Sequence, residues 1–268
     1  MLKYLKKRVF WILASQRRNV VGRFLFSTAQ SLLNALNNKI NDSNLSGEFW
    51  FLENLNHSEI KVVFDVGANV GKWTLELNRI NPEGSIYAFE PVPQTFNKLK
   101  EATKVTSKIN CFCNALSDDS GKLIFNFFPE QSTFSSGYSH FMGNNGIKIE
   151  VDSISGDEFC KNNSINSIDL LKIDTEGFES KVLLGFKEMF EKGQIKMVQF
   201  EYGPLALESR FLLADFYKFF ENHGFEVGKI FPNWIDFRPY SWKMENFVLA
   251  NFVAVRKDLK HTLISDNV

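Results

Sequence analysis

The chain has 268 residues, of which 44% are hydrophobic and 23% charged, and its 31 basic side chains balance its 31 acidic ones. That length and apolar content support a complete α/β core, which excludes an intrinsically disordered chain. A net charge of zero creates no overall field that attracts nucleic acid, so we expect no nucleic-acid partner. The three cysteines lack metal-ligand spacing, which predicts no zinc site or disulfide framework and fits a reducing compartment.

Residues 1–40 have a helical pattern and are strongly basic, with eight Lys or Arg and no acidic residue. The apolar run from Val9 to Ala14 is too short for a secretory signal or a membrane span, so we expect a cytoplasmic protein. Aromatic side chains among the basic ones favour peripheral contact with the inner face of a membrane. The alternative is a basic helix packed on the rest of the protein.

From Ile60 onward, strand and helix patterns alternate. Near-continuous apolar runs at 60–65 and 85–90 predict parallel strands that are covered on both faces. We predict an α/β fold with a Rossmann-like, doubly wound sheet of about seven strands and a terminal antiparallel hairpin, whose ligand lies beyond the carboxyl ends of the strands. The pattern also predicts an inserted hairpin around a polar stretch at 122–151. It predicts one continuous helix at 180–191 and another at 208–223.

The turn that follows the first strand carries the clearest chemical pattern. Gly67 and Gly71 allow a tight turn around Asn69, and Asp65 places a carboxylate at the end of the strand. The turn lacks the third glycine of a dinucleotide site and the Gly-Lys-Ser/Thr of a P-loop, so it suits the methionine moiety of a nucleoside better than a pyrophosphate. Glu90 ends the next strand, where it can accept both hydrogen bonds of a ribose diol. Structural turns with a solvated glutamate are the alternative.

Four motifs resemble the FkbM family of methyltransferases, and the resemblance runs from Phe64 to about Arg256: Phe64–Gly71, Ala88–Pro91, Asn114–Asp118 and Ile168–Glu179. It implies a class I methyltransferase fold, S-adenosylmethionine as the methyl donor, and a hydroxyl acceptor on a saccharide or natural product. It also implies that Asn114 and Ala115 contact the adenine edge and that Asp174 faces the reacting centre. One departure from the family pattern is Ile154-Ser-Gly-Asp157, where Thr-Leu-Asp is common.

The chain is thereby divided into a basic helical extension (1–58), an FkbM-like methyltransferase domain (59–258) and a tail (259–268). Two alternatives to an active methyltransferase stay open. One is a catalytically inactive, membrane-associated binding protein with this fold. The other is a nicotinamide-dependent oxidoreductase, which the missing third glycine disfavours. Neither the acceptor nor the oligomeric state follows from the sequence.

An alcohol is a poor nucleophile at neutral pH, so its methylation needs a base that removes the hydroxyl proton. Asp174 and Glu201 are the leading candidates, because both fall at strand ends. Glu176 is a third candidate, although it or Glu179 can instead cap the following helix or pair with a lysine. His140 in the polar insert can reach the acceptor only if its loop folds over the site. A divalent cation held by the acidic residues is compatible with the sequence, but no motif requires a metal.

Overall fold

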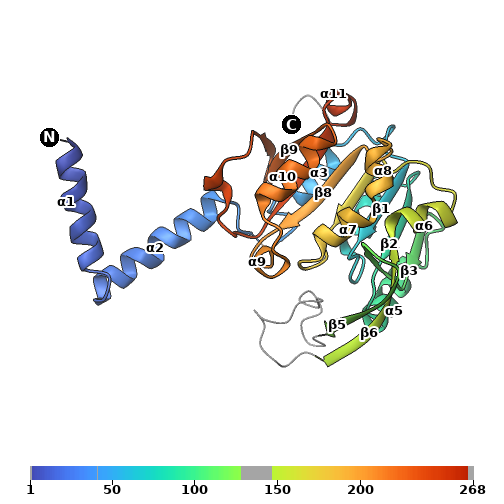
Figure 1. Ribbon diagram of the computed structural model, residues 1–268, viewed down its shortest axis with the longest axis horizontal. Helices are drawn as coiled ribbons and strands as arrows, with labels where there is room; N and C mark the ends of the chain where they lie inside the picture. Colours follow the sequence, from blue (N-terminus) through green and yellow to red (C-terminus); the bar gives the residue numbers. More distant parts are fainter. Residues whose placement is uncertain (1, 41, 128–146, 265–268) are drawn as a thin grey trace.

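The computed structural model describes residues 2–40, 42–127 and 147–264. Its main feature is an eight-stranded sheet with the order β10-β9-β11-β8-β7-β1-β2-β3 (Figure 1). Five neighbouring strands are parallel: β1 (Val62–Val66), β2 (Ser85–Phe89), β3 (Ile109–Phe112), β7 (Leu170–Ile173) and β8 (Met197–Tyr202). Antiparallel pairing joins the other three: β9 (Phe225–Phe231), β10 (Trp234–Phe237) and β11 (Ala250–Arg256).

The strand order reverses direction at β1. After β1 the chain continues to β2 and β3 on one side and then returns to β7 and β8 on the other. Such a switch point leaves a crevice at the carboxyl ends of the parallel strands, where ligands of doubly wound folds bind. The predicted fold class is therefore confirmed. The sheet has eight strands instead of about seven, because residues 234–237 pair with β9 as an edge strand.

Helices cover both faces of the sheet and form two hydrophobic cores. In β1, Phe64 and Val66 belong to one core and Val63 to the other, because successive side chains of a strand point to opposite faces. One face carries α6 (Gly156–Asn162), α7 (Glu179–Gly185), α8 (Lys187–Glu191), α9 (Ala206–Ser209) and α10 (Leu213–Asn222). The opposite face carries α3 (Glu48–Glu53), α4 (Lys72–Ile80), α5 (Pro93–Thr103) and α11 (Lys260–Leu263).

Two helices predicted as continuous are each divided in the structure. The predicted helix 180–191 breaks into α7 and α8 at Phe186, whose fully buried ring packs against Phe64 at 5.9 Å. The predicted helix 208–223 breaks into α9 and α10, because Arg210 adopts a left-handed conformation and Asp215 caps the start of α10. In both places packing or local capping prevails over helical periodicity.

A second, three-stranded sheet lies beside the main one and contains β4 (Ala115–Ser117), β5 (Gly121–Phe127) and β6 (Ile147–Ser155). Strands β5 and β6 pair antiparallel, as the predicted inserted hairpin requires. The tip of this insert, including His140, lies outside the described residues.

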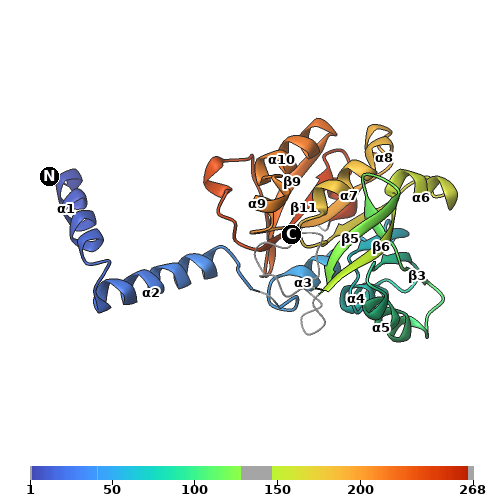
Figure 2. The same cartoon turned by 60° about the horizontal axis from the view of Figure 1, so that its bottom comes forward.

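The N-terminal helices α1 (Leu2–Ser15) and α2 (Val20–Leu36) project from the rest of the protein as an arm (Figures 1 and 2). The predicted helices are present, but they do not pack on the sheet domain as the alternative interpretation requires. In contrast, residues just after the arm contact the domain, where Asn38 Nδ2 donates to the Ile230 carbonyl at 3.0 Å. Within the described ranges, none of the helices combines the length and the apolar character that crossing a bilayer requires.

Candidate active site

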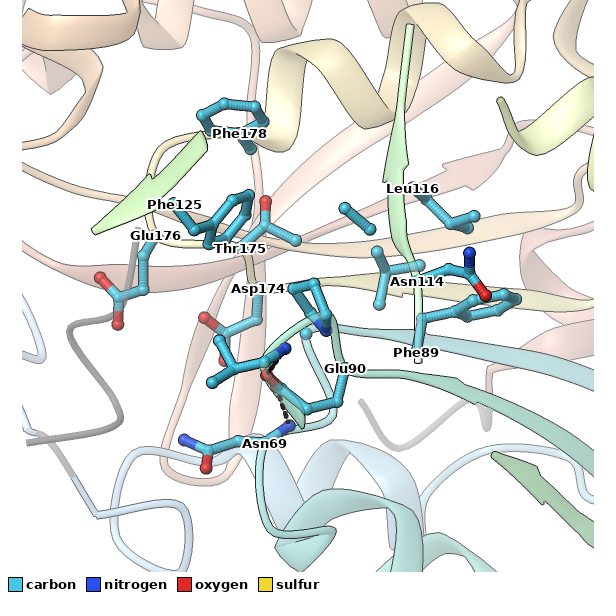
Figure 3. A pocket seen from close by; sticks show the side chains of 15 residues that line it. Asn69, Phe89, Glu90, Asn114, Leu116, Phe125, Asp174, Thr175, Glu176 and Phe178 are labelled. Atoms are coloured by element: carbon cyan, nitrogen blue, oxygen red, sulfur yellow. Dashed lines mark hydrogen bonds between the residues drawn. The ribbon is translucent and has the colours of Figure 1, made fainter. Parts of the chain in front are cut away.

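A cavity of about 100 Å³ opens at the carboxyl ends of β1, β2 and β7. Figure 3 shows it extending from Asn114 and Phe89 at one end to Asp174 and Glu176 at the other, with Glu90 between them. Seven of the residues predicted from the sequence line this cavity: Gly67, Asn69, Glu90, Asn114, Ala115, Asp174 and Glu176. Residues from four separate motifs therefore meet in one place.

The donor loop, residues 67–71, needs its glycines for conformation and for space. Gly67 has φ 82° and Gly71 has φ 85°, both in the left-handed region that favours glycine. A Cβ atom on Gly67 would lie only 1.8 Å from the Asp174 carbonyl oxygen. The loop therefore passes very close to the end of β7, where the predicted catalytic carboxylate lies.

Glu90 is buried at the end of β2 and holds the donor loop. Its Oε2 accepts a hydrogen bond from the Asn69 N–H at 3.1 Å, and its Oε1 accepts one from the Val92 N–H at 2.9 Å (Figure 3). A carboxylate has about four acceptor positions, which leaves capacity for a ribose diol. Burial raises the pKa of Glu90 to about 7, although the two backbone N–H groups act in the opposite direction.

This pKa predicts a pH dependence of nucleoside binding. The diol donates hydrogen bonds, so it binds better to ionised Glu90, whose fraction rises with pH and levels off above about pH 7. We expect the affinity for S-adenosylhomocysteine to increase about tenfold between pH 6 and pH 8. Calorimetry on the wild type and on Glu90→Gln measures this slope. The variant should bind more weakly and show a flat profile, whereas equal slopes would exclude Glu90 as the diol acceptor.

The Asn114 end of the cavity has apolar walls that suit an aromatic base, because Phe89 and Leu116 lie beside Asn114 (Figure 3). Phe125 in β5 and Phe178 before α7 line the cavity nearer to Thr175 and Glu176 (Figure 3). These apolar residues could not be identified from the sequence, because each also fits the pattern of an ordinary core residue. The side chain of Asn114 adds polar atoms to this apolar end.

Asp65 and Gly71 are the two predicted donor-site residues that line neither this cavity nor the larger one beside it. The side chain of Asp65 is fully buried, accepts a hydrogen bond from Thr74 Oγ1, and lies 3.1 Å from Lys172 Nζ on the neighbouring strand. Direct contact between Asp65 and the donor stays a prediction. Lys172 offers an indirect connection between Asp65 and the donor loop.

Lys172 is the buried cation of the site. Its Nζ lies 3.3 Å from Asp174 Oδ2 and 3.4 Å from the Gly67 carbonyl oxygen, and the side chain is only 4% exposed. Burial alone disfavours the charged form, but the carboxylates of Asp65 and Asp174 outweigh it and raise the pKa of Lys172 above its usual range. One ammonium group thus connects the donor loop to the ends of β1 and β7.

A second cavity, of about 620 Å³, joins the first at four shared residues: Gly67, Asn69, Asp174 and Glu176. Much of its remaining wall comes from residues 38–40, 42–48, 201–216 and 249–251. Most of these could not be identified from the sequence, because they lie in connecting segments without a recognisable motif. The shared boundary between a smaller and a larger cavity is a suitable place for transfer between two ligands.

Three predicted catalytic carboxylates meet at this boundary. One oxygen each from Asp174, Glu176 and Glu201 lies within 4.8 Å of the others, a spacing that is compatible with a divalent cation but does not require one. Burial, together with Asp174 and Glu176 nearby, raises the pKa of Glu201 well above its usual range. Burial, together with Asp174 and Glu179, raises the pKa of Glu176 to about 9. Glu176 therefore retains its proton at neutral pH.

The structure separates the two glutamates of the turn after β7. Glu179 Oε1 accepts hydrogen bonds from the Thr175 N–H and hydroxyl and from the Gly177 N–H, so Glu179 stabilises the turn. Glu176 instead adopts a left-handed φ of 53° and lines both cavities. Glu179 therefore stabilises the turn that precedes α7, whereas the N-cap of α7 carries no side-chain hydrogen bond.

The motifs that form this site lie within the region matched by the profile of one family, the methyltransferase FkbM domain, which covers residues 65–227. The chain belongs to the FkbM methyltransferase family. S-adenosylmethionine is accordingly the cofactor of this chain.

Three curated methyltransferases are similar to about half of this chain. The hexuronic acid methyltransferase AglP of Haloferax volcanii is 27% identical over 54% of this chain and 58% of its own length. The 2-O-methyltransferase NoeI of Sinorhizobium fredii is 25% identical, with 54% and 65% covered. The 31-O-demethyl-FK506 methyltransferase FkbM of Streptomyces tacrolimicus is 29% identical, with 47% and 60% covered. The chain thus spans about three fifths of the length of these curated relatives.

Proposed function

We propose that this FkbM-family protein transfers a methyl group from S-adenosylmethionine to a hydroxyl of a saccharide or a glycosylated natural product. The observation that carries the proposal is the boundary between the two cavities, where Asp174 and Glu176 line both. The smaller cavity accommodates the donor, and the larger one, with its polar and carboxylate-rich wall, accommodates a polyhydroxyl acceptor. The named activities of the relatives, on a hexuronic acid and at oxygen atoms, support this acceptor class.

The proposed roles of the chain's own residues follow from their positions. Bound S-adenosylmethionine supplies an electrophilic methyl group. Glu90 and Asn114 orient the nucleoside, and the donor loop holds the methionine end near Asp174. The carboxylate of Asp174 or Glu201 accepts the proton of the acceptor hydroxyl, while Lys172 keeps Asp174 in position.

Methyl transfer to a defined panel tests the proposal. Calorimetry should detect binding of S-adenosylmethionine but not of reduced nicotinamide dinucleotide. The panel contains hexuronic acids, neutral hexosides and hexosamines, each incubated with donor labelled in its methyl group. Label recovered as an O-methyl sugar supports the proposed reaction. Label on an amine or a carboxylate, or failure to bind the donor, contradicts it.

We also propose that the protein acts in the cytoplasm, with peripheral membrane contact through residues 1–40. The arm supports this proposal, because its helices are basic and largely exposed. The chemistry of the membrane that it fits is developed below.

A further inference from the structure

The arm, residues 2–36, presents an exposed apolar face on each of its two helices. Four exposed apolar residues in each helix recur at helical spacing and so share one side of it. They are 44% to 75% exposed: Leu5, Val9, Ile12 and Leu13 in α1, and Val21, Leu25, Leu32 and Leu36 in α2. Further exposed apolar side chains, among them Phe10 and Trp11, lie elsewhere on the arm. Contiguous apolar surface of this kind marks an interaction site rather than an ordinary surface.

The charge of the arm defines the kind of partner. Residues 1–40 contain eight basic and no acidic side chains, while residues 41–268 contain eight more acidic than basic ones. Helical periodicity places Lys3, Lys7 and Arg23 opposite the apolar faces. An anionic surface therefore attracts the arm and repels the remainder of the chain, which favours one orientation.

The corner between the two helices is a defined structure. The Asn19 side chain accepts a hydrogen bond from the Gly22 N–H at 2.8 Å and caps α2. A Cβ atom on Gly22 would lie 1.8 Å from the Gln16 carbonyl oxygen, so the chain passes too closely for any other residue. The Arg17 guanidinium lies over the Phe26 ring at 3.6 Å. These contacts define the bend at which α1 and α2 meet (Figures 1 and 2).

We propose that the arm docks on an anionic lipid bilayer, with α1 and α2 lying in its interfacial region. The apolar faces enter the boundary between head groups and acyl chains, and the lysines and arginines pair with lipid phosphates. An anionic bilayer offers both an apolar region for the apolar faces and negative charge for the basic side chains. The arm of a second copy would instead bring basic residues against basic residues, which repel one another. Membrane docking of the arm adds to the proposed function. It rests on that function in one respect only, which is the identity of the enzyme that is anchored.

Vesicle binding by the full-length protein tests the proposal. We expect co-sedimentation with phosphatidylcholine vesicles that contain phosphatidylglycerol and at least about tenfold weaker binding to pure phosphatidylcholine. The triple variant Lys6→Glu, Lys7→Glu, Arg8→Glu should weaken binding by at least about 100-fold, because each basic residue near an anionic surface contributes a factor of several. Val21→Asp with Leu32→Asp should abolish binding through the apolar face.

Matched controls lie on the sheet domain. Lys218→Glu and Val105→Asp change exposed residues of the same types there and should bind vesicles like the wild type. All variants should bind S-adenosylhomocysteine normally, so failure of donor binding would count against the proposed function and not against the anchor. Equal vesicle binding by the wild type and the arm variants would overturn the proposal. So would a dimer in light scattering that the apolar variant dissociates, without vesicle binding by either protein.

Discussion

Replacing Asp174 by Asn is expected to lower turnover by about 10²- to 10⁴-fold, because the amide cannot accept the proton of the acceptor hydroxyl. The affinity for S-adenosylmethionine should change by less than about threefold, since the substitution preserves shape and removes an interaction that matters during transfer. Asp174 is 34% exposed at the boundary of the two cavities, so it can reach an acceptor. Donor calorimetry and steady-state turnover on the best acceptor of the panel measure the two effects separately.

The neighbouring carboxylates sharpen this experiment. Glu201→Gln should also lower turnover. Wild-type turnover should rise with pH above neutrality, because burial raises the pKa values of Glu201 and Glu176. Each of these residues must lose its proton before it can act as a base. Glu226→Gln, near the start of β9, is the matched control and should have no effect. Parallel assays with EDTA test a contribution from a divalent cation. Unchanged turnover in both Asp174→Asn and Glu201→Gln would remove the carboxylate base.

Replacing Lys172 by Met is expected to destabilise the protein by about 3–5 kcal/mol, the usual cost of removing one partner of a buried ion pair. Asp65 would remain fully buried without its cation, and the donor loop would lose the Lys172 contact with the Gly67 carbonyl. Urea unfolding at neutral pH measures the loss in free energy of unfolding. Affinity for S-adenosylhomocysteine should fall as well, because the donor loop is no longer held against β7.

A second buried lysine provides the control. Lys229 in β9 is 8% exposed, and this burial lowers its pKa to about 8. Its surroundings therefore disfavour the charged form, and the substitution Lys229→Met removes that charge. We expect Lys229→Met to be close to neutral in stability. The double variant Asp65→Asn, Lys172→Met should recover part of the loss, because it no longer leaves a buried charge unpaired. A Lys172→Met protein as stable as Lys229→Met would contradict the role of the ion pair.

Much of the sheet could be predicted from the sequence, because strands that are buried on both faces must be apolar along their whole length. The run from Val62 to Val66 is such a strand at every position except Asp65. What could not be predicted depends on distant packing. Phe186 ends α7 because its ring occupies a place in the core, which helical periodicity does not record. The edge strand β10 exists because residues 234–237 find a partner in β9.

The donor side of the site could also be predicted, because glycines in a tight turn and acids at strand ends leave a local signature. The acceptor side could not, since residues 38–40, 42–48 and 249–251 reach it from segments without a motif. Even within the motif, the surroundings of Asp65 could not be predicted from the sequence. Its position in the turn indicated a ligand contact, whereas the register that pairs β1 with β7 places it next to Lys172.

Residues 38–40 and 42–48 lie between α2 and the body of α3, and several of them also line the larger cavity. Thermodynamic linkage between two sites is reciprocal. Any factor by which docking of the arm raises the affinity for an acceptor is therefore the same factor by which a bound acceptor raises the affinity of the protein for the surface. An enzyme arranged in this way would bind the surface most tightly where its acceptor is abundant.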